Sequence, residues 1–477
     1  MSIKKTSEVS EARTLWPHFL IYINYAFTVS VLIINIVIIA GIMWPGDIPF
    51  AFELHAGELG ILTGTSIYII AISGILFGYL ADKFSRTKLM AFVEITYGIG
   101  LFFNGFIPAG QDHTTYFFFL IFSLVRGFSI GGFWPLITSH VDDSTETEER
   151  SQFFGTMQAS FQVFQIFGMF VSAILFQNNY WRIYFIAVGI LALVFGFVIL
   201  IRGKEPKRGA KREELKQVLS SEDVVYEYKL TKDTIRSTIF APTNLIAFFE
   251  GVFTTILLGV PDFLMVAYLQ SPPYNFSPFI SAIFLIIFGL PGGLIGSLAF
   301  AKISDKLGKK SIKYRIYMIV LSTITLSLVY IVIFNLPLPI MTPEQGNNIL
   351  FVLSVPVIWI MGLAAFIARA VVGLWNINQP PVLQQINLPE AQGKIISANQ
   401  FLESLGAGTG PIIAGFILIA FNQNFQLTVL ITMILGTIGG LLWLLATIWV
   451  EKDVSRVSAI LGERKKELSN SSKSEKI

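Results

Sequence analysis

The sequence contains no cysteine, which excludes disulfide bonds, thiolate metal sites and cysteine nucleophiles. Charged residues are also few, at 14% of the 477 residues, compared with about 25% in ordinary soluble domains. The four histidines, His18, His55, His113 and His140, are scattered along the chain. No nucleotide-binding loop, metal cluster or catalytic triad can be read. The sequence therefore favours neither an enzyme nor an ATP-driven pump, and no cofactor or metal is expected.

Apolar residues are abundant, with 53% hydrophobic residues and a mean hydropathy of +0.66. This composition indicates an integral membrane protein. A hydrocarbon core about 30 Å thick is spanned by about 20 apolar residues in a helix. Segments of that length predict an all-α membrane protein with twelve transmembrane helices, at roughly 14–43, 57–81, 88–110, 114–141, 149–177, 180–202, 239–270, 277–301, 312–336, 347–377, 390–421 and 425–450.

The positions of Lys and Arg predict the orientation of these helices, because positive charge is retained on the cytoplasmic side. With the N-terminus inside, 31 of the 34 Lys and Arg residues lie in inner segments or adjoining helix ends. Only Arg182 lies outside, and Arg126 and Arg369 lie within helices. We therefore expect a multi-pass protein of the cell membrane with both termini cytoplasmic. Its basic residues follow the inner leaflet, so no nucleic-acid partner is expected.

A burst of charge separates two apolar runs at Gly78–Lys88, and a weaker copy returns at Ala301–Lys310. Each copy has an aspartate, Asp82 or Asp305, followed directly by a lysine and, four residues on, by a basic residue. The repeat predicts two related halves. The expected organisation is an N-terminal six-helix bundle (1–202), a cytoplasmic linker with short amphipathic helices (203–238), a C-terminal six-helix bundle (239–450) and a disordered cytoplasmic tail (451–477).

This charged pattern resembles the loop between the second and third helices of the major facilitator superfamily, roughly Gly-x-Leu-x-Asp-Arg-x-Gly-Arg-Lys. The resemblance implies that Gly78 is a close-packing glycine and that Asp82 is a gate aspartate with Lys83 and Arg86 as basic partners. It also implies that Asp82 closes the inner side by bridging to the start of helix eleven. Ser85 replaces the usual glycine. In the second copy Ala301 replaces the packing glycine, and the matching positions are Asp305, Lys306, Gly308 and Lys309.

Charged residues inside the predicted helices are the candidate functional groups, because an unpaired charge at the centre of a bilayer costs about 3 kcal/mol on insertion scales. Arg126 and Arg369 are candidates either for interhelical tethers or for substrate binding. The candidate proton-coupling acids are Glu94, Glu250, Asp262 and Glu403. Glu94 is placed where a motif residue such as Arg86 could reach it, and Asp262 could equally lie in water at the outer mouth.

The remaining candidate substrate-binding residues are polar or aromatic residues of predicted helices one, four, ten and eleven, namely Asn24, Trp134, Trp375 and Gln400. For the polar residues of helix one, helix-to-helix hydrogen bonding is the alternative interpretation. For the aromatic residues, the alternative is ordinary packing. The glycine run Gly406–Pro411 loosely resembles a signature of exporters in this superfamily, but close helix packing explains it as well.

Within the superfamily, short matches resemble spinster-like transporters, which include lysophospholipid and sphingolipid carriers. These matches are Asn24-Tyr25 with Phe27-Thr28, Phe77-Gly78-Tyr79-Leu80, Pro261-Asp262-Phe263-Leu264 and Ala398-Asn399-Gln400. Two features of those relatives are missing here. Only Ala26 stands where they carry an Asp-Arg pair in helix one, and Phe133 stands where they carry a glutamate after the helix-four glycines.

The resemblance implies a secondary active or facilitative transporter in which two six-helix bundles alternate access to a central site. An apolar cavity with one or two fixed cations suits an amphipathic molecule such as a lysolipid or an organic anion. A drug or small-metabolite exporter of the same fold and a non-transporting membrane sensor are the alternatives. The expected partners are a small-molecule substrate, the lipid bilayer and, as candidate coupling ions, protons. The protein is expected to be a monomer.

Overall fold

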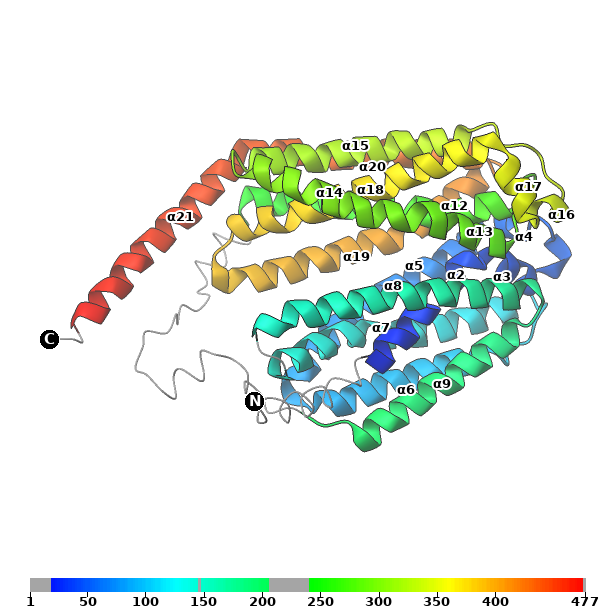
Figure 1. Cartoon of the computed structure of the whole chain (residues 1–477), viewed down its shortest axis with the longest axis horizontal. Helices are drawn as coiled ribbons and strands as arrows, with labels where there is room; N and C mark the ends of the chain where they lie inside the picture. Colours follow the sequence, from blue (N-terminus) through cyan, green and yellow to red (C-terminus); the bar gives the residue numbers. More distant parts are fainter. Residues whose placement is uncertain (1–18, 145–146, 206–239, 475–477) are drawn as a thin grey trace, which may run out of the picture. The chain divides into compact units, whose positions relative to one another are not determined.

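The computed structural model describes residues 19–144, 147–205 and 240–474. Most of the predicted linker 203–238 lies outside the described residues, as do its expected amphipathic helices. The regular secondary structure of the described residues is helical, without a strand. The chain divides into two compact units, each described separately (Figure 1).

Unit 1 comprises residues 1–223, 266–283 and 341–347. Its long helices are α5 (Ala56–Lys83), α6 (Arg86–Asn104), α7 (His113–Ser144), α8 (Thr147–Gln177) and α9 (Trp181–Arg202). Its shorter elements are α2 (Val31–Ile34), α3 (Ile36–Met43), η1 (Pro45–Asp47), α4 (Ala51–Leu54) and α16 (Pro343–Gly346). Helix α6 packs against α7 and α9, and α5 packs against α7.

Unit 2 holds the remaining residues, 224–265, 284–340 and 348–477. Its elements are the π-helical turn η2 (Leu285–Gly289), α14 (Leu290–Gly308), α15 (Lys313–Asn335), α17 (Ile349–Ser354), α18 (Pro356–Gln385), α19 (Pro389–Ala420), α20 (Phe425–Gly440) and α21 (Trp443–Ser474). Helix α18 packs against α14 and α15.

The chain passes between the units inside two helices. Helix α12 (Pro242–Gln270) passes from unit 2 to unit 1 after Met265, four residues beyond its internal Pro261. Helix α13 (Pro278–Phe284) returns to unit 2 at its last residue, directly before the π-helical turn η2. Each crossing therefore lies next to an interruption of regular α-helical hydrogen bonding.

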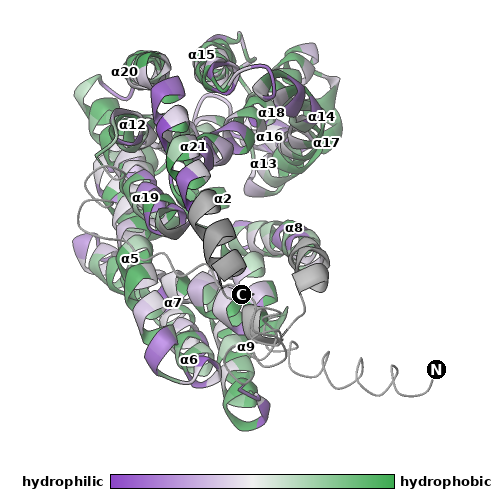
Figure 2. Ribbon diagram, turned by 90° about the vertical axis from the view of Figure 1, so that its left-hand side faces the viewer, coloured by the Kyte–Doolittle hydropathy of each residue, from purple (hydrophilic) through white to green (hydrophobic). Residues whose placement is uncertain are grey.

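Twelve membrane-spanning helices can be assigned. Ten described helices are long and apolar enough to cross a membrane, and a bent pair, Phe19–Ile34 with Ile36–Met43, makes an eleventh. The twelfth is α6, whose 19 residues are less apolar because they include Arg86, Lys88 and Glu94. Figure 2 shows hydrophobic residues along much of α5, α14 and α15. Exposed apolar side chains such as Phe197, Leu328 and Ile438 fit a surface that faces lipid.

Helix one is broken at Asn35, where its two parts meet at 66°. The Asn35 side chain donates to the main-chain oxygen of Val31 at 3.0 Å and competes there with the helix's own hydrogen bonding. The main-chain oxygen of Ile34 accepts a hydrogen bond from Gln270 Nε2 at 2.8 Å. This bond satisfies a carbonyl at the break, as an apolar environment requires.

The close packing expected at Gly78 lies elsewhere. A methyl group added at Gly78 would meet no described atom within 4 Å, so that prediction is wrong. The close approach between α5 and α7 occurs at Gly131, where a methyl carbon would lie 2.3 Å from Ile70 O and 2.9 Å from Gly74 N. Gly373 fills the corresponding role in unit 2, against Ser297 of α14.

The glycine run of predicted helix eleven packs closely against α12. A methyl group at Gly406 would lie 2.3 Å from Val252 O, and one at Gly410 would lie 2.9 Å from Ile256 O. The packing interpretation of this run is therefore confirmed.

The expected disorder after residue 451 is wrong for most of the tail, because α21 continues to Ser474. Asp453 anchors this extension by accepting a hydrogen bond from Thr243 Oγ1 at 2.6 Å, and its side chain is buried. Val454 packs against the buried apolar cluster of unit 2, and Val457, three residues later on the helix, is also buried. The charged composition that suggested disorder also contains good helix formers, Leu, Lys and Glu.

Candidate functional site

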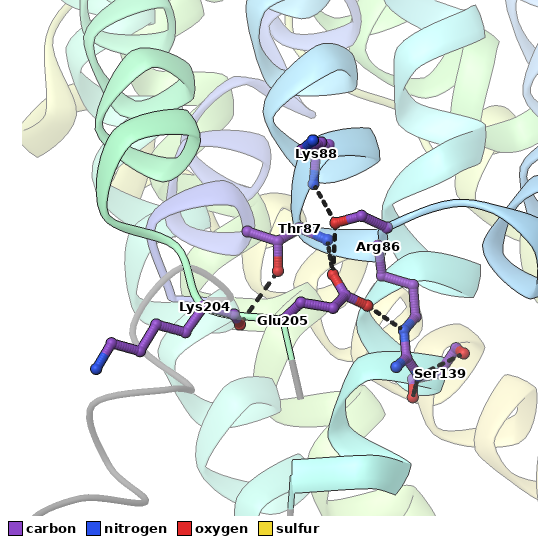
Figure 3. Close-up of polar contacts among 7 residues, drawn as sticks. Arg86, Thr87, Lys88, Ser139, Lys204 and Glu205 are labelled. Atoms are coloured by element: carbon purple, nitrogen blue, oxygen red, sulfur yellow. Dashed lines mark hydrogen bonds and ion pairs between the residues drawn. The ribbon is translucent and has the colours of Figure 1, made fainter. Parts of the chain in front are cut away.

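The first charged motif is a two-residue corner, Phe84–Ser85, between α5 and α6, with Asp82 and Lys83 still inside α5. Arg86, the first residue of α6, is only 2% exposed. Its Nε donates to Glu205 Oε1 at 2.9 Å, and its Nη1 donates to Ser139 O at 2.7 Å (Figure 3). Arg86 therefore joins the start of α6 to α7 and to the segment after α9.

Glu205 receives further hydrogen bonds from the same corner. Its Oε2 accepts from Thr87 N at 2.8 Å and from Ser85 Oγ at 2.7 Å. A carboxylate at the first turn of α6 also meets the positive end of the helix dipole. Partial burial acts to raise the pKa of Glu205, but the bonds from Thr87, Ser85 and Arg86 outweigh it and lower this pKa to about 2. Glu205 thus stays ionised as the acceptor of this cluster, which we call the Arg86 clasp (Ser85, Arg86, Thr87, Ser139 and Glu205).

A similar clasp occurs in unit 2. Ser311 Oγ donates to Glu451 Oε1 at 3.2 Å, and Lys313 Nζ lies 2.9 Å from Glu451 Oε2. We call it the Lys313 clasp (Ser311, Lys313 and Glu451). In both units a serine and a basic residue near the start of one helix hold a glutamate from later in the chain: Glu205 from the segment after α9 and Glu451 from inside α21. The Lys313 clasp is the more exposed, with side-chain exposures of 32% for Lys313 and 55% for Glu451.

The other predicted motif residues lie at these same ends of the units. Asp82 is exposed, and Lys83 lies with Nζ 4.3 Å from the ring centre of Tyr79. The bridge expected between Asp82 and the start of helix eleven stays a prediction. In the second copy Lys306 and Lys309 are exposed, whereas Asp305 Oδ1 binds Arg315 Nη2 at 2.9 Å.

Gly308 makes the Asp305–Arg315 ion pair possible. A methyl carbon at Gly308 would lie 2.5 Å from Arg315 Nε, so a larger residue there would require the guanidinium to shift. Because α14 runs to Gly308, the second motif is helical rather than a loop.

Polar residues of helix one bind other helices of unit 1. Asn24 Nδ2 donates to Glu94 Oε1 at 2.8 Å, and Thr28 Oγ1 forms a hydrogen bond with Tyr97. Both Asn24 and Glu94 are buried. The proposed contact between Arg86 and Glu94 is thus replaced by one between Asn24 and Glu94, and Glu94 Oε2 lacks a hydrogen-bond partner among the described residues.

The two intramembrane arginines have different surroundings. Arg126 is 5% exposed, donates to Ser123 Oγ at 2.8 Å and lies 5.9 Å from the ring centre of Phe185. A methyl group at Gly100 of α6 would lie 2.9 Å from Arg126 Cγ, so its stem passes closely over that helix. These contacts favour the tether interpretation for Arg126.

Arg369 of α18 is accessible and paired. Its Nη2 lies 2.6 Å from Asp262 Oδ1 of α12, and the two side chains are 39% and 42% exposed. Both belong to unit 2. The sequence left Arg369 open between an interhelical tether and substrate binding, and Asp262 between proton coupling and a position in water at the outer mouth. In the structure the two side chains form one ion pair between α18 and α12.

Glu250 and Glu403 form an acidic pair inside unit 2. Glu250 is fully buried and accepts hydrogen bonds from Thr254 and from the indole of Trp443. Glu403 Oε1 accepts from Gln379 Nε2 at 2.6 Å. A methyl group at Gly251, the residue after Glu250, would lie 3.0 Å from Glu403 Cγ. Among the described residues, neither carboxyl has a cationic partner.

The last candidate substrate residues differ in access. Trp134 is 54% exposed, and Gln400 is also exposed. Trp375 is buried in an apolar cluster with Val382 and Trp443. Of the six candidate substrate residues, Trp134, Arg369 and Gln400 are accessible, and Asn24, Arg126 and Trp375 are buried.

Glu205 is the functional residue that sequence reasoning missed. Its partner Arg86 lies 119 residues earlier, so spacing gives no hint of the pair. The available signal was an acid shortly after the last spanning helix of the first half, two residues beyond Gly203, which follows that helix. A methyl group at this Gly203 would lie 2.3 Å from Thr87 Cγ2.

Two helical units with charged clasps at matching ends and ionisable residues inside their spans define a polytopic membrane protein of the transporter class. The chain belongs to the Major Facilitator Superfamily, whose family model matches residues 19–379. Membership makes it a transporter rather than an enzyme.

Relatives and solved structures are similar to this chain at low identity. A probable sugar efflux transporter of Helicobacter acinonychis (strain Sheeba) is 23% identical over 298 residues, which is 62% of this chain and 69% of that protein. A counterpart from Helicobacter pylori (strain ATCC 700392 / 26695) is 21% identical over 297 residues, again 62% of this chain and 69% of that protein.

The fold is similar to that of a bacterial homologue of the human lysosomal transporter Spinster in an inward-facing, unoccupied conformation. The TM-score is 0.70, with 16% identity, over 93% of this chain and 98% of that one. A D-xylose–proton symporter gives a TM-score of 0.58 at 16% identity, over 90% and 95% of the two chains. These identities show the shared fold alone.

Proposed function

We propose that this transporter moves an amphipathic molecule with an anionic group, such as a lysolipid or an organic anion, by alternating access. The observation that carries the proposal is the ion pair of Arg369 and Asp262, both about two-fifths exposed. An accessible guanidinium already held by one carboxylate can exchange that carboxylate for an anionic group of a substrate, with two parallel hydrogen bonds. Arg126, closed in by Ser123 and Phe185, offers no comparable access.

Proton coupling is proposed for the acidic pair of Glu250 and Glu403. Two carboxyl groups inside an apolar bundle without a cation are costly when ionised, so at least one favours its protonated form. Their hydrogen-bond donors, Trp443 and Gln379, can hold either form in place. The pair would supply the acidic groups that the relatives carry in helices one and four and this chain lacks.

The spinster-like resemblance of the sequence supports the choice of an amphipathic substrate. We also propose a cell-membrane location, cytoplasmic termini and a monomeric state. Tags on either terminus of protein in intact cells should be protected from added protease.

The direct test is flux of a fluorescent lysophospholipid into proteoliposomes, with and without a pH gradient. We expect flux in native protein that rises with the gradient, and at least about tenfold weaker binding of anionic amphiphiles in Arg369→Ala, since a charge-assisted hydrogen bond contributes about 1.5–3 kcal/mol. Equal affinities in the two proteins would refute the role of Arg369. A Lys313→Ala variant, which removes a partly exposed positive charge at the first residue of α15, serves as the charge control.

A small-metabolite exporter, including a sugar exporter, is the second candidate. The names of the Helicobacter relatives favour it. Neutral sugars need no cation, so sugar flux that is unchanged in Arg369→Ala would support this alternative. Ligand binding without flux of any tested substrate would instead support a membrane sensor.

A further inference from the structure

Glu53 is a buried carboxyl outside the membrane-spanning helices. It lies in the short helix α4, between helix one and α5, and is only 4% exposed. Its Oε2 has no hydrogen-bond partner among the described residues. A buried, half-satisfied carboxyl is tolerated when neutral and is costly when ionised.

The segment that covers Glu53 follows α12. Ser271 faces the carboxyl, is fully buried, and its hydroxyl completes no geometrically good hydrogen bond within the described chain. The preceding Gln270 donates to Ile34 O at the break of helix one. Residues 270–271 of the second half of the chain therefore pack onto residues 34–53 of the first, and all lie in unit 1.

The segment 341–347 belongs to the same contact. Met341 N donates to Pro273 O at 3.0 Å, and Asn275 Nδ2 donates to Met341 O at 2.7 Å. At its far end Asn347 Oδ1 accepts from Gln177 Nε2 of α8 at 2.8 Å. The two segments are thus tied together, so they should leave or join the first half of the chain as one piece.

Charged groups on the elements around α4 are engaged with one another. His55 Nε2 lies 2.8 Å from Asp47 Oδ2 of η1, and its Nδ1 lies 3.6 Å from Glu58 Oε1 of α5. Trp44 stacks on the His55 ring and also meets His113 of α7 edge-on. The covering segment 271–277 has Tyr274 as its one titratable side chain. Within the described residues no cation pairs with Glu53.

We propose that Glu53 is a proton-operated latch: the neutral carboxyl lets segments 270–277 and 341–347 pack onto the first half of the chain, and loss of its proton releases them.

The direction of the pH dependence follows from the burial. Burial raises the pKa of Glu53 above its ordinary value of 4.5, and the nearby Ser271 hydroxyl offsets this only in part. The packed form thus holds the proton more tightly than a released form in which Glu53 meets water. Packing is favoured at low pH and is lost as pH rises through the raised pKa. Each further pH unit raises the ratio of ionised to neutral carboxyl tenfold.

The test uses nitroxide pairs on the full chain in lipid nanodiscs. Because the chain has no cysteine, Gln177→Cys with Asn347→Cys gives two unique labelling sites across the contact. Room-temperature spin–spin broadening then reports the fraction of closely spaced pairs between pH 4.5 and 9. We expect this fraction to fall with rising pH when Glu53 is present, and to stay high across the range with Glu53→Gln.

Glu344→Gln is the matched control, because it removes a carboxyl from the same segment at an exposed position. In this control the fraction of closely spaced nitroxide pairs should fall with rising pH, as in the parent, the labelled double-cysteine protein that keeps Glu53. Glu53→Met is neutral and of similar volume, so segments 270–277 and 341–347 should also stay packed in this variant. It replaces Glu53→Gln in the test if that variant does not fold. A parent that shows no titration, or neutral variants that titrate like the parent, would overturn the proposal. The readout involves no transport, so failure here leaves the proposed substrate and coupling untouched.

Discussion

Arg86 and Glu205 form a 2.9 Å ion pair in which the arginine is almost fully buried and the glutamate is about one-third exposed. The pair fixes the segment after α9 to the corner between α5 and α6. Its counterpart, Lys313 with Glu451, has the same 2.9 Å separation but is far more open to solvent. The same chemistry should therefore contribute more to unit 1 than to unit 2.

Removal of the Arg86 side chain should be more damaging than removal of Lys313. Arg86→Ala removes the cation paired with Glu205 Oε1 and the donor to the Ser139 carbonyl, and loss of one partner of a buried pair costs about 3–5 kcal/mol. The exposed Lys313→Ala change should cost about 0–1 kcal/mol. Thermal unfolding of the purified variants checks this, and equal losses of Tm would contradict it.

Acid should weaken the Arg86 clasp. The folded-state pKa of Glu205 is about 2, below its ordinary value of 4.5. A depressed pKa gives stability that is fully present above pH 4.5 and is lost as pH falls toward 2. Tm measured from pH 6 to pH 3 should fall more steeply in native protein than in Glu205→Gln, which is less stable at neutral pH but has no proton to gain there. Parallel curves of Tm against pH for the two proteins would contradict a stabilising role of ionised Glu205.

Two glycines should respond in opposite ways to alanine. Gly131→Ala forces a methyl group to 2.3 Å from Ile70 O, and overpacking of this kind costs about 1–3 kcal/mol or more. Gly78→Ala meets open space and gains about 0.5–1 kcal/mol of helix propensity. The Tm values of the two variants test this prediction. A larger loss of Tm in Gly78→Ala than in Gly131→Ala would support the close-packing role that the family resemblance implied for Gly78.

Neutral variants of the acidic pair should uncouple transport from the pH gradient. Glu403→Gln and Glu250→Gln keep the shape and the hydrogen bonds to Gln379 and Trp443 but cannot release a proton. We expect substrate flux that no longer rises with an imposed gradient, while counterflow exchange persists. Glu344→Gln again serves as the control, and gradient-driven flux in both variants of the pair would exclude them as the coupling groups.

The helical tail should be part of the folded unit up to Val457. Truncation after Val450 removes Asp453, which binds Thr243 at the start of α12, and should lower stability by about 1–3 kcal/mol because a buried hydroxyl loses its partner. Truncation after Arg464 keeps these contacts and should have little effect. Similar Tm values for the two truncations would show that the anchor contributes nothing.

The sequence predicted the twelve helices and the two related halves because apolar length and repeated charge are local properties. It could not pair Arg86 with Glu205 or Arg369 with Asp262, since partners more than 100 residues apart depend on which helices become neighbours. Gly78 was singled out by resemblance, but close packing is decided by the facing helix, and α7 approaches α5 at Gly131. The burial of Glu53 could not be predicted either, because Ser271, which faces its carboxyl, lies more than 200 residues later in the chain.

The passage of α12 from one unit to the other has a consequence for cooperativity. Amide hydrogens of Val266–Gln270 should exchange with solvent at the protection level of unit 1, and those a few turns earlier in the same helix at the level of unit 2. A single continuous helix would then show two exchange regimes, with the step between them just after Pro261. Local unfolding of either unit would therefore involve α12, because this one helix contains residues of both units.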